Sequence, residues 1–115
     1  MNEYSEPITD EFMKDMISIT RNYCIVLIKH GPNWNMEGAE KIIWEHGRRN
    51  FALQMSGALP IVCPISDGSD LCGVGIFTSE AGELKRIVDK DPGVKKGIFI
   101  YEIHPCRSFP GSSLP

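Results

Sequence analysis

A histidine stands in the middle of the segment IIWEHGRRNF, residues 42–51, where apolar residues recur at helical spacing. This pattern places His46 on the apolar side of a predicted helix. One interpretation is a neutral core histidine whose ring nitrogens are satisfied locally. The other is a general acid or base, because histidine is the side chain whose unperturbed pKa lies nearest neutrality.

A catalytic histidine needs a group that orients one ring nitrogen, usually a carboxylate, and the sequence offers two. Asp91 precedes Pro92, which disfavours helical backbone in the residue before it, so we expect Asp91 at the exposed exit of a helix with a free carboxylate. Asp67 precedes Gly68 in a predicted type I′ hairpin turn. Each aspartate also has a purely structural interpretation, Asp91-Pro92 as a helix end and Asp67-Gly68 as a turn, so the choice of partner stays open.

The remaining histidines and glycines lack the spacing of a metal or cofactor site. His30 and His104, taken with His46, do not match the close ligand spacing of a zinc-binding helix. Gly73 and Gly75 lie in a strand pattern without the third glycine and following helix of a dinucleotide fingerprint, and indicate a bulge or a close backbone approach. We therefore expect no metal and no cofactor.

Four cysteines, at positions 24, 63, 72 and 106, show no C-x-x-C spacing. A two-residue turn at Asp67-Gly68 would place Cys63 opposite Cys72, but free thiols are expected in a reducing compartment. The segment EHGRR predicts a solvated helix face, although Arg48 or Arg49 near the mouth of a pocket could hold a carboxylate.

Length and composition predict one compact, cytoplasmic domain. The chain has 115 residues, 42% of them hydrophobic, and a formal net charge of -3. No cluster of Lys and Arg would follow a phosphate backbone, so we expect no nucleic-acid partner. The longest apolar run, residues 24–28, is too short for a membrane helix, and the acidic N-terminus lacks a basic region before an apolar one.

The elements that must position His46 follow from hydrophobic periodicity. After an amphipathic helix capped by Thr9 or Asp10, the pattern predicts a strand at 23–29, a helix from Met36 to about Met55, a hairpin, a helix capped by Thr78 or Ser79, a strand at 98–103 and an irregular tail. Pro60 and Pro64 place the first hairpin strand at a sheet edge or bulge. The long helix has an arc of Ala39, Ile42, Ile43, His46, Asn50 and Leu53 and a second apolar stripe of Trp44, Phe51 and Met55.

This order predicts an α+β, ferredoxin-like βαββαβ fold with two helices on one face of a four-stranded antiparallel sheet. The predicted strands at 23–29 and 98–103 are apolar on both faces. The second face therefore needs a cover, and the same face of another copy can supply one. We expect a homodimer packed sheet against sheet, with the N-terminal helix as a capping arm or partner-binding helix.

Two longer segments, HGRRNFALQMSGALPIVCPI and TSEAGELKRIVDKDPGVKKGIFIYEIHPCR, resemble the YCII-related family. The resemblance covers residues 22–107, leaving an N-terminal helical extension at 1–21 and a flexible tail at 108–115. It implies a dimeric α+β barrel like that of muconolactone isomerases, with His46 and Asp91 as a pair in a pocket between helix and sheet. Cys63 and Cys106 depart from the family pattern, where a glycine and a tryptophan are usual.

These observations together predict an enzyme that works without a cofactor. His46, oriented by Asp91, would exchange a proton with a small cyclic, aromatic or keto acid in an isomerisation or elimination, and some family members are dehydrochlorinases. The alternative is a non-catalytic dimeric module that binds a small molecule or a protein, with His46 in a structural role.

Overall fold

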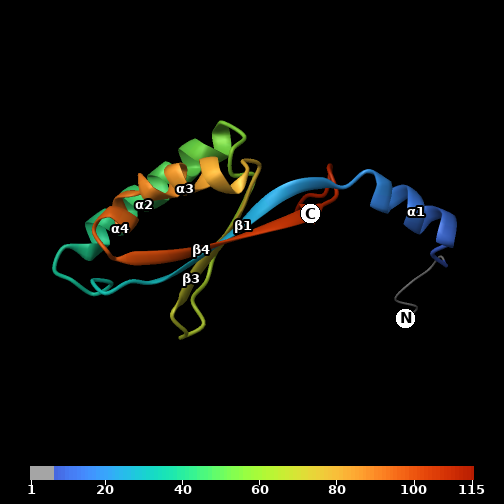
Figure 1. Ribbon diagram of the computed structural model, residues 1–115. Coiled ribbons are helices and arrows are strands. Elements are labelled where there is room, and N and C mark those ends of the chain that lie inside the picture. Colours follow the sequence, from blue (N-terminus) through green and yellow to red (C-terminus); the bar gives the residue numbers. More distant parts are fainter. Residues whose placement is uncertain (1–6) are drawn as a thin grey trace.

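The computed structural model describes residues 7–115 and has an α+β architecture with a four-stranded antiparallel sheet (Figure 1). Its elements are α1 (Asp10–Ser18), β1 (Arg21–His30), α2 (Ala39–Met55), β2 (Ile61–Pro64), β3 (Leu71–Phe77), α3 (Ala81–Asp89), α4 (Pro92–Lys95) and β4 (Phe99–Ser108). The strand order β2-β3-β1-β4 is consistent with the predicted ferredoxin-like arrangement. Residues 1–6 of the predicted extension at 1–21 lie outside the described residues.

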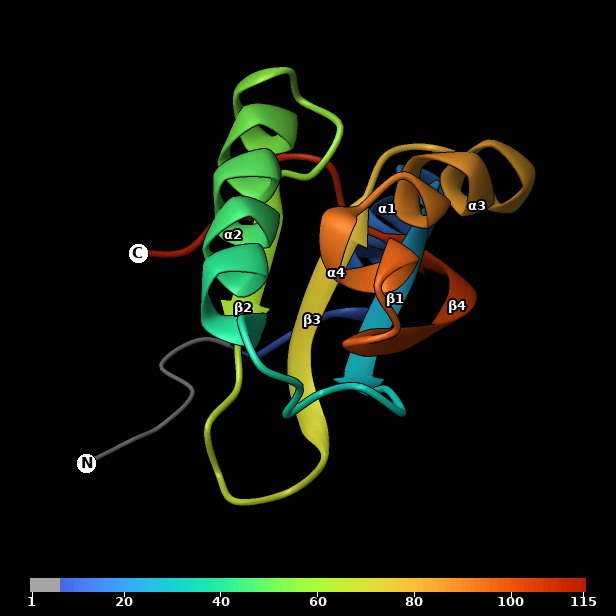
Figure 2. The same cartoon turned by 90° about the vertical axis from the view of Figure 1, so that its left-hand side faces the viewer.

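Helices α2, α3 and α4 lie on one side of the sheet, as Figure 2 shows with the helices in front of the strands. Alternate residues of the central strands, including Val26 and Phe77, point to this side and are buried with Leu84 and Val88 of α3. A second buried cluster joins Ala39 of α2 to the start of β4. These two clusters form the core. The second contacts the start of α2 through Ala39, and the first contacts the end of α2 through Leu53.

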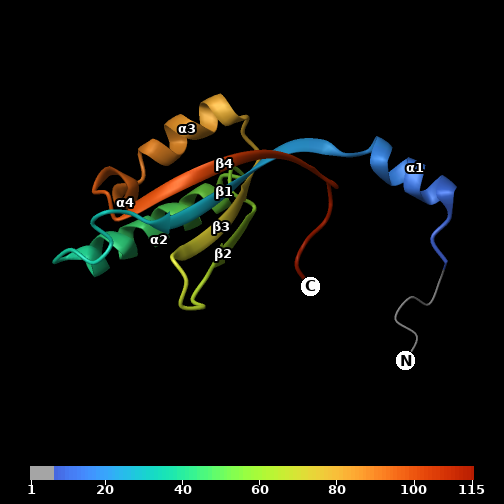
Figure 3. The ribbon, with the colours of Figure 1, turned by 60° about the horizontal axis from the view of Figure 1, so that its bottom comes forward.

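The opposite sheet face is apolar as well. Ile25 and Leu27 of β1 alternate with the buried Cys24 and Val26, and Ile25 pairs in register with Ile76 of β3. All five are aliphatic or thiol side chains, so both faces of the sheet favour burial. None of the elements described for residues 7–115 forms a second helix layer on that face (Figures 2 and 3).

Strands β1 and β4 continue as a two-stranded ribbon beyond the end of β3. The pairing of β1 with β3 ends at Cys24 and Phe77, whereas Arg21 still pairs with Ser108 of β4. This ribbon carries α1 away from the rest of the domain (Figures 1 and 3). Thr9 caps α1 as predicted, since its side chain accepts a hydrogen bond from the Phe12 amide at 3.0 Å.

The predicted hairpin is present, but its register and its turn differ from the prediction. Cys63 pairs with Val74, not with Cys72. A type I′ turn requires positive φ at both central residues, and in this loop only Gly68 has it, with φ of 84°. Asp67 instead accepts hydrogen bonds from the Ser69 amide and hydroxyl, so the connection is a longer loop built on an Asx turn.

Strand β2 lies at the sheet edge, which confirms the prediction made from Pro60 and Pro64. Two other boundaries were predicted wrongly. The cap of α3 is Glu80, not Thr78 or Ser79, because Thr78 is engaged with the carbonyl of Ala58 through its amide. Strand β4 runs through to Ser108 where an irregular tail was expected, since a proline in its path is tolerated on an edge strand.

Candidate functional site

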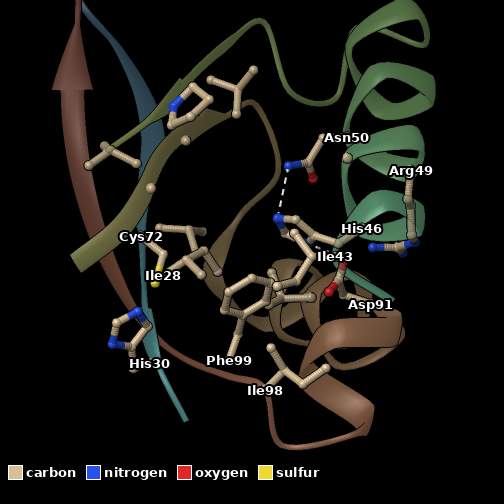
Figure 4. A pocket seen from close by; sticks show the side chains of 18 of the residues that line it. Ile28, His30, Ile43, His46, Arg49, Asn50, Cys72, Asp91, Ile98 and Phe99 are labelled. Atoms are coloured by element: carbon tan, nitrogen blue, oxygen red, sulfur yellow. Dashed lines mark hydrogen bonds and ion pairs between the residues drawn. The ribbon is translucent and has the colours of Figure 1, made fainter. Parts of the chain in front are cut away.

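The structure brings His46 and Asp91 together. His46 lies on the inner face of α2, and its Nδ1 is 2.8 Å from Asp91 Oδ1 (Figure 4). Asp67, the other candidate partner, lies in the exposed β2–β3 loop and bonds to Ser69, which lowers the pKa of its carboxyl. Of the two aspartates, Asp91 is therefore the one that contacts His46.

Asp91 does not sit at an exposed helix exit, as the sequence suggested, but is buried with 3% of its surface exposed. It caps the short helix α4, with extended backbone at φ of -64° and ψ of 133°, which Pro92 at the first helical position favours. Its Oδ2 accepts hydrogen bonds from the amides of Gly93 at 2.9 Å and Val94 at 3.3 Å. The prediction of a free carboxylate was wrong because the proline both ends one helix and begins the next.

The residue after this proline must be small. A Cβ on Gly93 would lie 2.5 Å from Cδ2 of Phe99, so only glycine lets the Phe99 ring approach α4 this closely. The same ring packs against His46, with 4.7 Å between ring centroids and a 54° tilt. The sequence Asp-Pro-Gly thus places the carboxylate, starts α4 and admits the aromatic ring that supports the histidine.

The hydrogen bonds determine which nitrogen of the His46 ring carries a proton. The Asp91 carboxylate already accepts two backbone donors and can only accept from His46, so Nδ1 donates. In the neutral ring Nε2 then presents a lone pair. The Asn50 amide nitrogen lies 3.3 Å from Nε2 and donates a long hydrogen bond to it.

Asn50 lies on the predicted inner arc of α2, but nothing in its residue type or position predicted a chemical role. The signal that would have found it is the spacing of four residues from His46, which makes the two side chains neighbours on a helix surface. Asn50 completes a row of three polar side chains, Asn50, His46 and Asp91, at the junction of α2 and α4 (Figure 4).

This polar row borders a cavity of about 670 Å³ between α2 and the helix-facing side of the sheet. A volume of this size is typical of small-molecule sites. The walls are largely apolar, with Ile43 and Leu53 from α2 and Val26 from β1. Gly73 and Gly75 of β3 also line the cavity, and the absence of their side chains leaves room between the strand and α2.

Those two glycines carry different constraints. A Cβ on Gly75 would lie 2.9 Å from Cδ1 of Leu59, so Gly75 marks a close approach of a side chain and not the close backbone approach that was one of the two predictions. A Cβ on Gly73 would meet only the Cys63 carbonyl oxygen at 3.4 Å, an ordinary contact. The register of β1 with β3 shifts between Ile28, which pairs with Gly73, and Lys29, which pairs with Leu71, so the irregularity that was predicted as a bulge lies next to Gly73.

Two further polar groups lie at the cavity wall. Arg49 lines the cavity and donates from Nη2 to the Ile87 carbonyl oxygen at 2.8 Å, near the C-terminal end of α3. Arg48 instead pairs with Glu45 on the exposed side of α2. His30, the last residue of β1, also lines the cavity and stacks on Trp34, with 4.3 Å between centroids.

All four cysteines are free. Cys63 and Cys72 line the cavity, and burial, followed by the charge of Asp70, raises the pKa of the Cys72 thiol. The Cys72 thiol therefore does not resemble an activated nucleophile, which needs a lowered pKa. Within residues 7–115, no three or more His, Cys, Asp and Glu side chains are grouped so that they could hold a metal ion.

The fold and the site together define a small α+β domain with an antiparallel sheet and a histidine–aspartate pair at the edge of an apolar cavity. No protein-family model matches the chain, and no curated protein is significantly similar to it in sequence. Across the part of the chain that the structure describes, no helix is long and apolar enough to cross a membrane.

Proposed function

We propose that this protein is a cofactor-independent acid–base enzyme of the YCII-related type that acts on a small cyclic or aromatic acid. In this proposal the neutral His46 ring takes a proton through Nε2 from a carbon or hydroxyl of the substrate. Asp91 holds Nδ1 as the donor and stabilises the imidazolium that forms. The proton then returns to another position, giving isomerisation, or a leaving group departs with its electron pair, giving elimination.

The observation that carries the proposal is the coupling of one ring nitrogen to a fixed carboxylate while the ring borders a cavity. The 2.8 Å contact and the two amide hydrogen bonds to Asp91 hold the pair in one geometry. About 17% of the His46 side chain remains exposed. A base must reach its substrate proton within hydrogen-bond distance, and a ring that borders a cavity of this kind meets that requirement.

The lining supports a planar, mostly apolar ligand with one acidic group. Phe99 and the aliphatic wall favour a ring, while Arg49 supplies a positive charge for a carboxylate. Arg49 uses one donor on the Ile87 carbonyl, and the guanidinium has further donors. A small aromatic or keto acid bound in this way would lie with its ring between α2 and β3.

The same proposal includes a homodimer packed through the bare sheet face, forming the dimeric α+β barrel of the family. Apolar side chains such as Ile25, Leu27 and Ile76 support it, because an exposed face of this kind favours a cover. Lys29 and Glu102 pair on this face at 2.5 Å, and His104 extends the pair. Such a polar group at an apolar interface would fix the register of the two sheets.

The alternative, a non-catalytic binding module, also has an observation in its favour. Both ring nitrogens of His46 have a partner within the chain, Asp91 on one side and Asn50 on the other. The Asn50 contact is long at 3.3 Å, so a substrate that offers a better hydrogen bond can displace it. The two functions therefore differ in whether Nε2 exchanges a proton with the ligand.

The test is hydrogen–deuterium exchange at carbon in a panel of small aromatic and keto acids, followed by NMR in D₂O. Abstraction of a proton bound to carbon produces exchange whether or not the full reaction is known. We expect exchange with the native protein and loss of it in His46→Gln. Lys85→Gln, at an exposed side chain of α3 that pairs with Asp89 and does not line the cavity, serves as the control. Binding of a ligand at the cavity without exchange would support the module and refute proton abstraction from carbon.

A further inference from the structure

Helix α1 has an apolar face that its own domain leaves uncovered. Phe12, Met13, Met16 and Ile17 fall on one arc of about 140° at 100° per residue. Phe12 and Met13 are each 49% exposed and Ile17 is 55% exposed, and no residue of α1 is buried. An amphipathic helix this short is marginal in water unless the apolar face is packed against something.

The connection to β1 prevents α1 from folding back on its own domain. Only Ile19 and Thr20 separate α1 from β1, and both amides donate to carbonyls of the last turn of α1. Arg107 of β4 also donates to the Thr20 hydroxyl at 2.5 Å. The junction is therefore held by hydrogen bonds, and it points α1 away from α2, α3 and α4 (Figures 1 and 3).

A matching apolar surface lies on the outer side of α2. Trp44, Phe51 and Met55, the second stripe of the sequence analysis, are 71%, 66% and 90% exposed. Between Trp44 and Phe51 lies a hollow of about 290 Å³ that Gly47 and Arg48 also line. Gly47 leaves the hollow open, because nothing lies within 4 Å of the place where its Cβ would be.

We propose that α1 of one copy packs on the Trp44–Phe51–Met55 stripe of α2 in a second copy, and that the contact is reciprocal. The stripe spans 12 residues, 44–55, or roughly 17 Å along the axis of α2, and the nine residues of α1 span roughly 13 Å, so α1 fits within the length of the stripe. Asp15 borders the Phe12 edge of the α1 face and Lys14 borders its Ile17 edge, while Arg48 at the hollow already pairs with Glu45. The two surfaces are therefore matched by their apolar side chains and not by charge.

The area is sufficient for a dimer only if the contact occurs twice. If each of the six largest exposed side chains on the two helices contributes on the order of 100 Å², one contact covers roughly 600 Å² and the reciprocal pair roughly 1,200 Å². This total lies at the lower end of stable interfaces. A two-fold arrangement supplies both contacts at once, which is why a second copy of this chain fits better than an unrelated partner. The contact leaves the bare sheet face free and does not depend on the proposed sheet-packed dimer.

The experiment uses Trp44 as a reporter within the stripe itself. The chain has two tryptophans, so Trp34→Phe leaves Trp44 as the sole emitter. In this background we expect the Trp44 emission to be blue-shifted at high protein concentration and to move to the red on dilution as α1 of the partner leaves. Ile17→Glu should raise the concentration at the midpoint at least tenfold, since it places a charge in the interface. Ser18→Glu adds the same charge one residue away on the polar side of α1 and should change the midpoint less than about twofold.

A second variant identifies the occupant. Phe51→Glu should raise the midpoint as Ile17→Glu does, and a mixture of these two variants, which restores one native contact, should associate more tightly than either variant alone. If the wavelength of Trp44 emission changes neither with protein concentration nor in Ile17→Glu, the proposal is overturned. Blue-shifted emission that is independent of concentration would also overturn it, as would an unchanged midpoint in Phe51→Glu, the result expected if the α1 helices paired with each other. Circular dichroism of each variant checks that these exposed substitutions leave the fold intact.

Discussion

Asp91→Asn preserves the shape of the side chain at the centre of the site and changes what it can do toward His46. The asparagine oxygen can still accept from the Gly93 and Val94 amides, so the cap of α4 survives. Its NH₂ group then faces Nδ1, where it can only donate. The His46 ring must therefore move its proton to Nε2 so that Nδ1 accepts, and Nε2 loses the lone pair that a base requires.

The magnitude follows from the exchange of one hydrogen bond for another. A hydrogen bond to a charged group contributes about 1.5–3 kcal/mol and a neutral one about 1 kcal/mol, so the Asn variant should lose roughly 1–2 kcal/mol of unfolding free energy. For a chain of 115 residues this corresponds to a fall in Tm of roughly 4–8 °C. Asp91→Ala removes the cap as well and leaves buried donors unpaired, so it should cost about 1–2 kcal/mol more.

Two measurements check this reasoning. Thermal unfolding compares the Asn and Ala variants, and ¹⁵N chemical shifts of the His46 ring report its tautomer. We expect the Nδ1–H form in the native protein and the Nε2–H form in Asp91→Asn, with proton exchange into the substrate falling on the order of 10⁴-fold, as tautomer inversion does in a Ser-His-Asp enzyme. A ring that keeps its proton on Nδ1 in the Asn variant, or an Asn variant as unstable as the Ala variant, would refute the argument.

Three further outcomes test other parts of the structure. Gly93→Ala should lower the unfolding free energy by about 1–3 kcal/mol, because its methyl group would overlap the Phe99 ring. Gly82→Ala, in α3 with open space around it, should raise the unfolding free energy by up to about 1 kcal/mol, and chemical denaturation measures both. Tyr101→Phe removes the hydrogen bond that is the main cause of the lowered pKa of Asp89. The resulting loss of stability should therefore be present near pH 7 and fade as the pH falls through the lowered pKa of Asp89, where the carboxyl becomes protonated. Thermal unfolding across pH measures the difference between the two proteins, and a difference that does not shrink in acid would contradict this. Gly73→Val should leave the fold intact, because the new Cβ would make only one ordinary contact, with the Cys63 carbonyl oxygen. The valine side chain should fill part of the cavity and weaken ligand binding, which calorimetry measures. Unchanged binding would mean that the ligand binds elsewhere.

The order of elements was predictable because hydrophobic period, prolines and glycines act locally. The edge position of β2 followed from its two prolines, which cannot donate to a neighbouring strand. The hairpin register was not predictable in the same way, since Asp-Gly is compatible with several loops. The choice among them depended on the side-chain hydrogen bonds of Asp67 to Ser69. The pairing is shifted by two residues as a result, so Cys63 lies opposite Val74 and not opposite Cys72.

The site was predictable in its members but not in its construction. Helical spacing put His46 on the inner arc, and the proline after Asp91 indicated an unusual backbone there. Whether that backbone leads into solvent or into a new helix depends on the next residues. Gly93 permits α4 to turn against Phe99, and this tertiary contact, invisible in local propensity, buries the aspartate. The role of Asn50 was not predicted, because an amide side chain on a helix is common. Only the proposed role of His46, four residues before it, makes its position informative.

The way α2 is held explains why a cavity can exist next to the pair. Its first turn packs through Ala39 against Ile98 and Phe99, and its last turn through Leu53 against the cluster around Leu59. Between these two anchors the helix is supported by the hydrogen bond from His46 to Asp91, and the glycines of β3 leave the facing strand without side chains. The pair is thus both the middle support of α2 and the polar edge of the cavity. A ligand that fills the space should therefore stabilise the fold by RT ln(1 + [L]/Kd), and it should do so in His46→Gln as well, provided that its contacts are with the apolar wall. Stabilisation that vanished with His46 would mean instead that the ligand is held by the ring itself, which separates binding to the cavity from binding to the base.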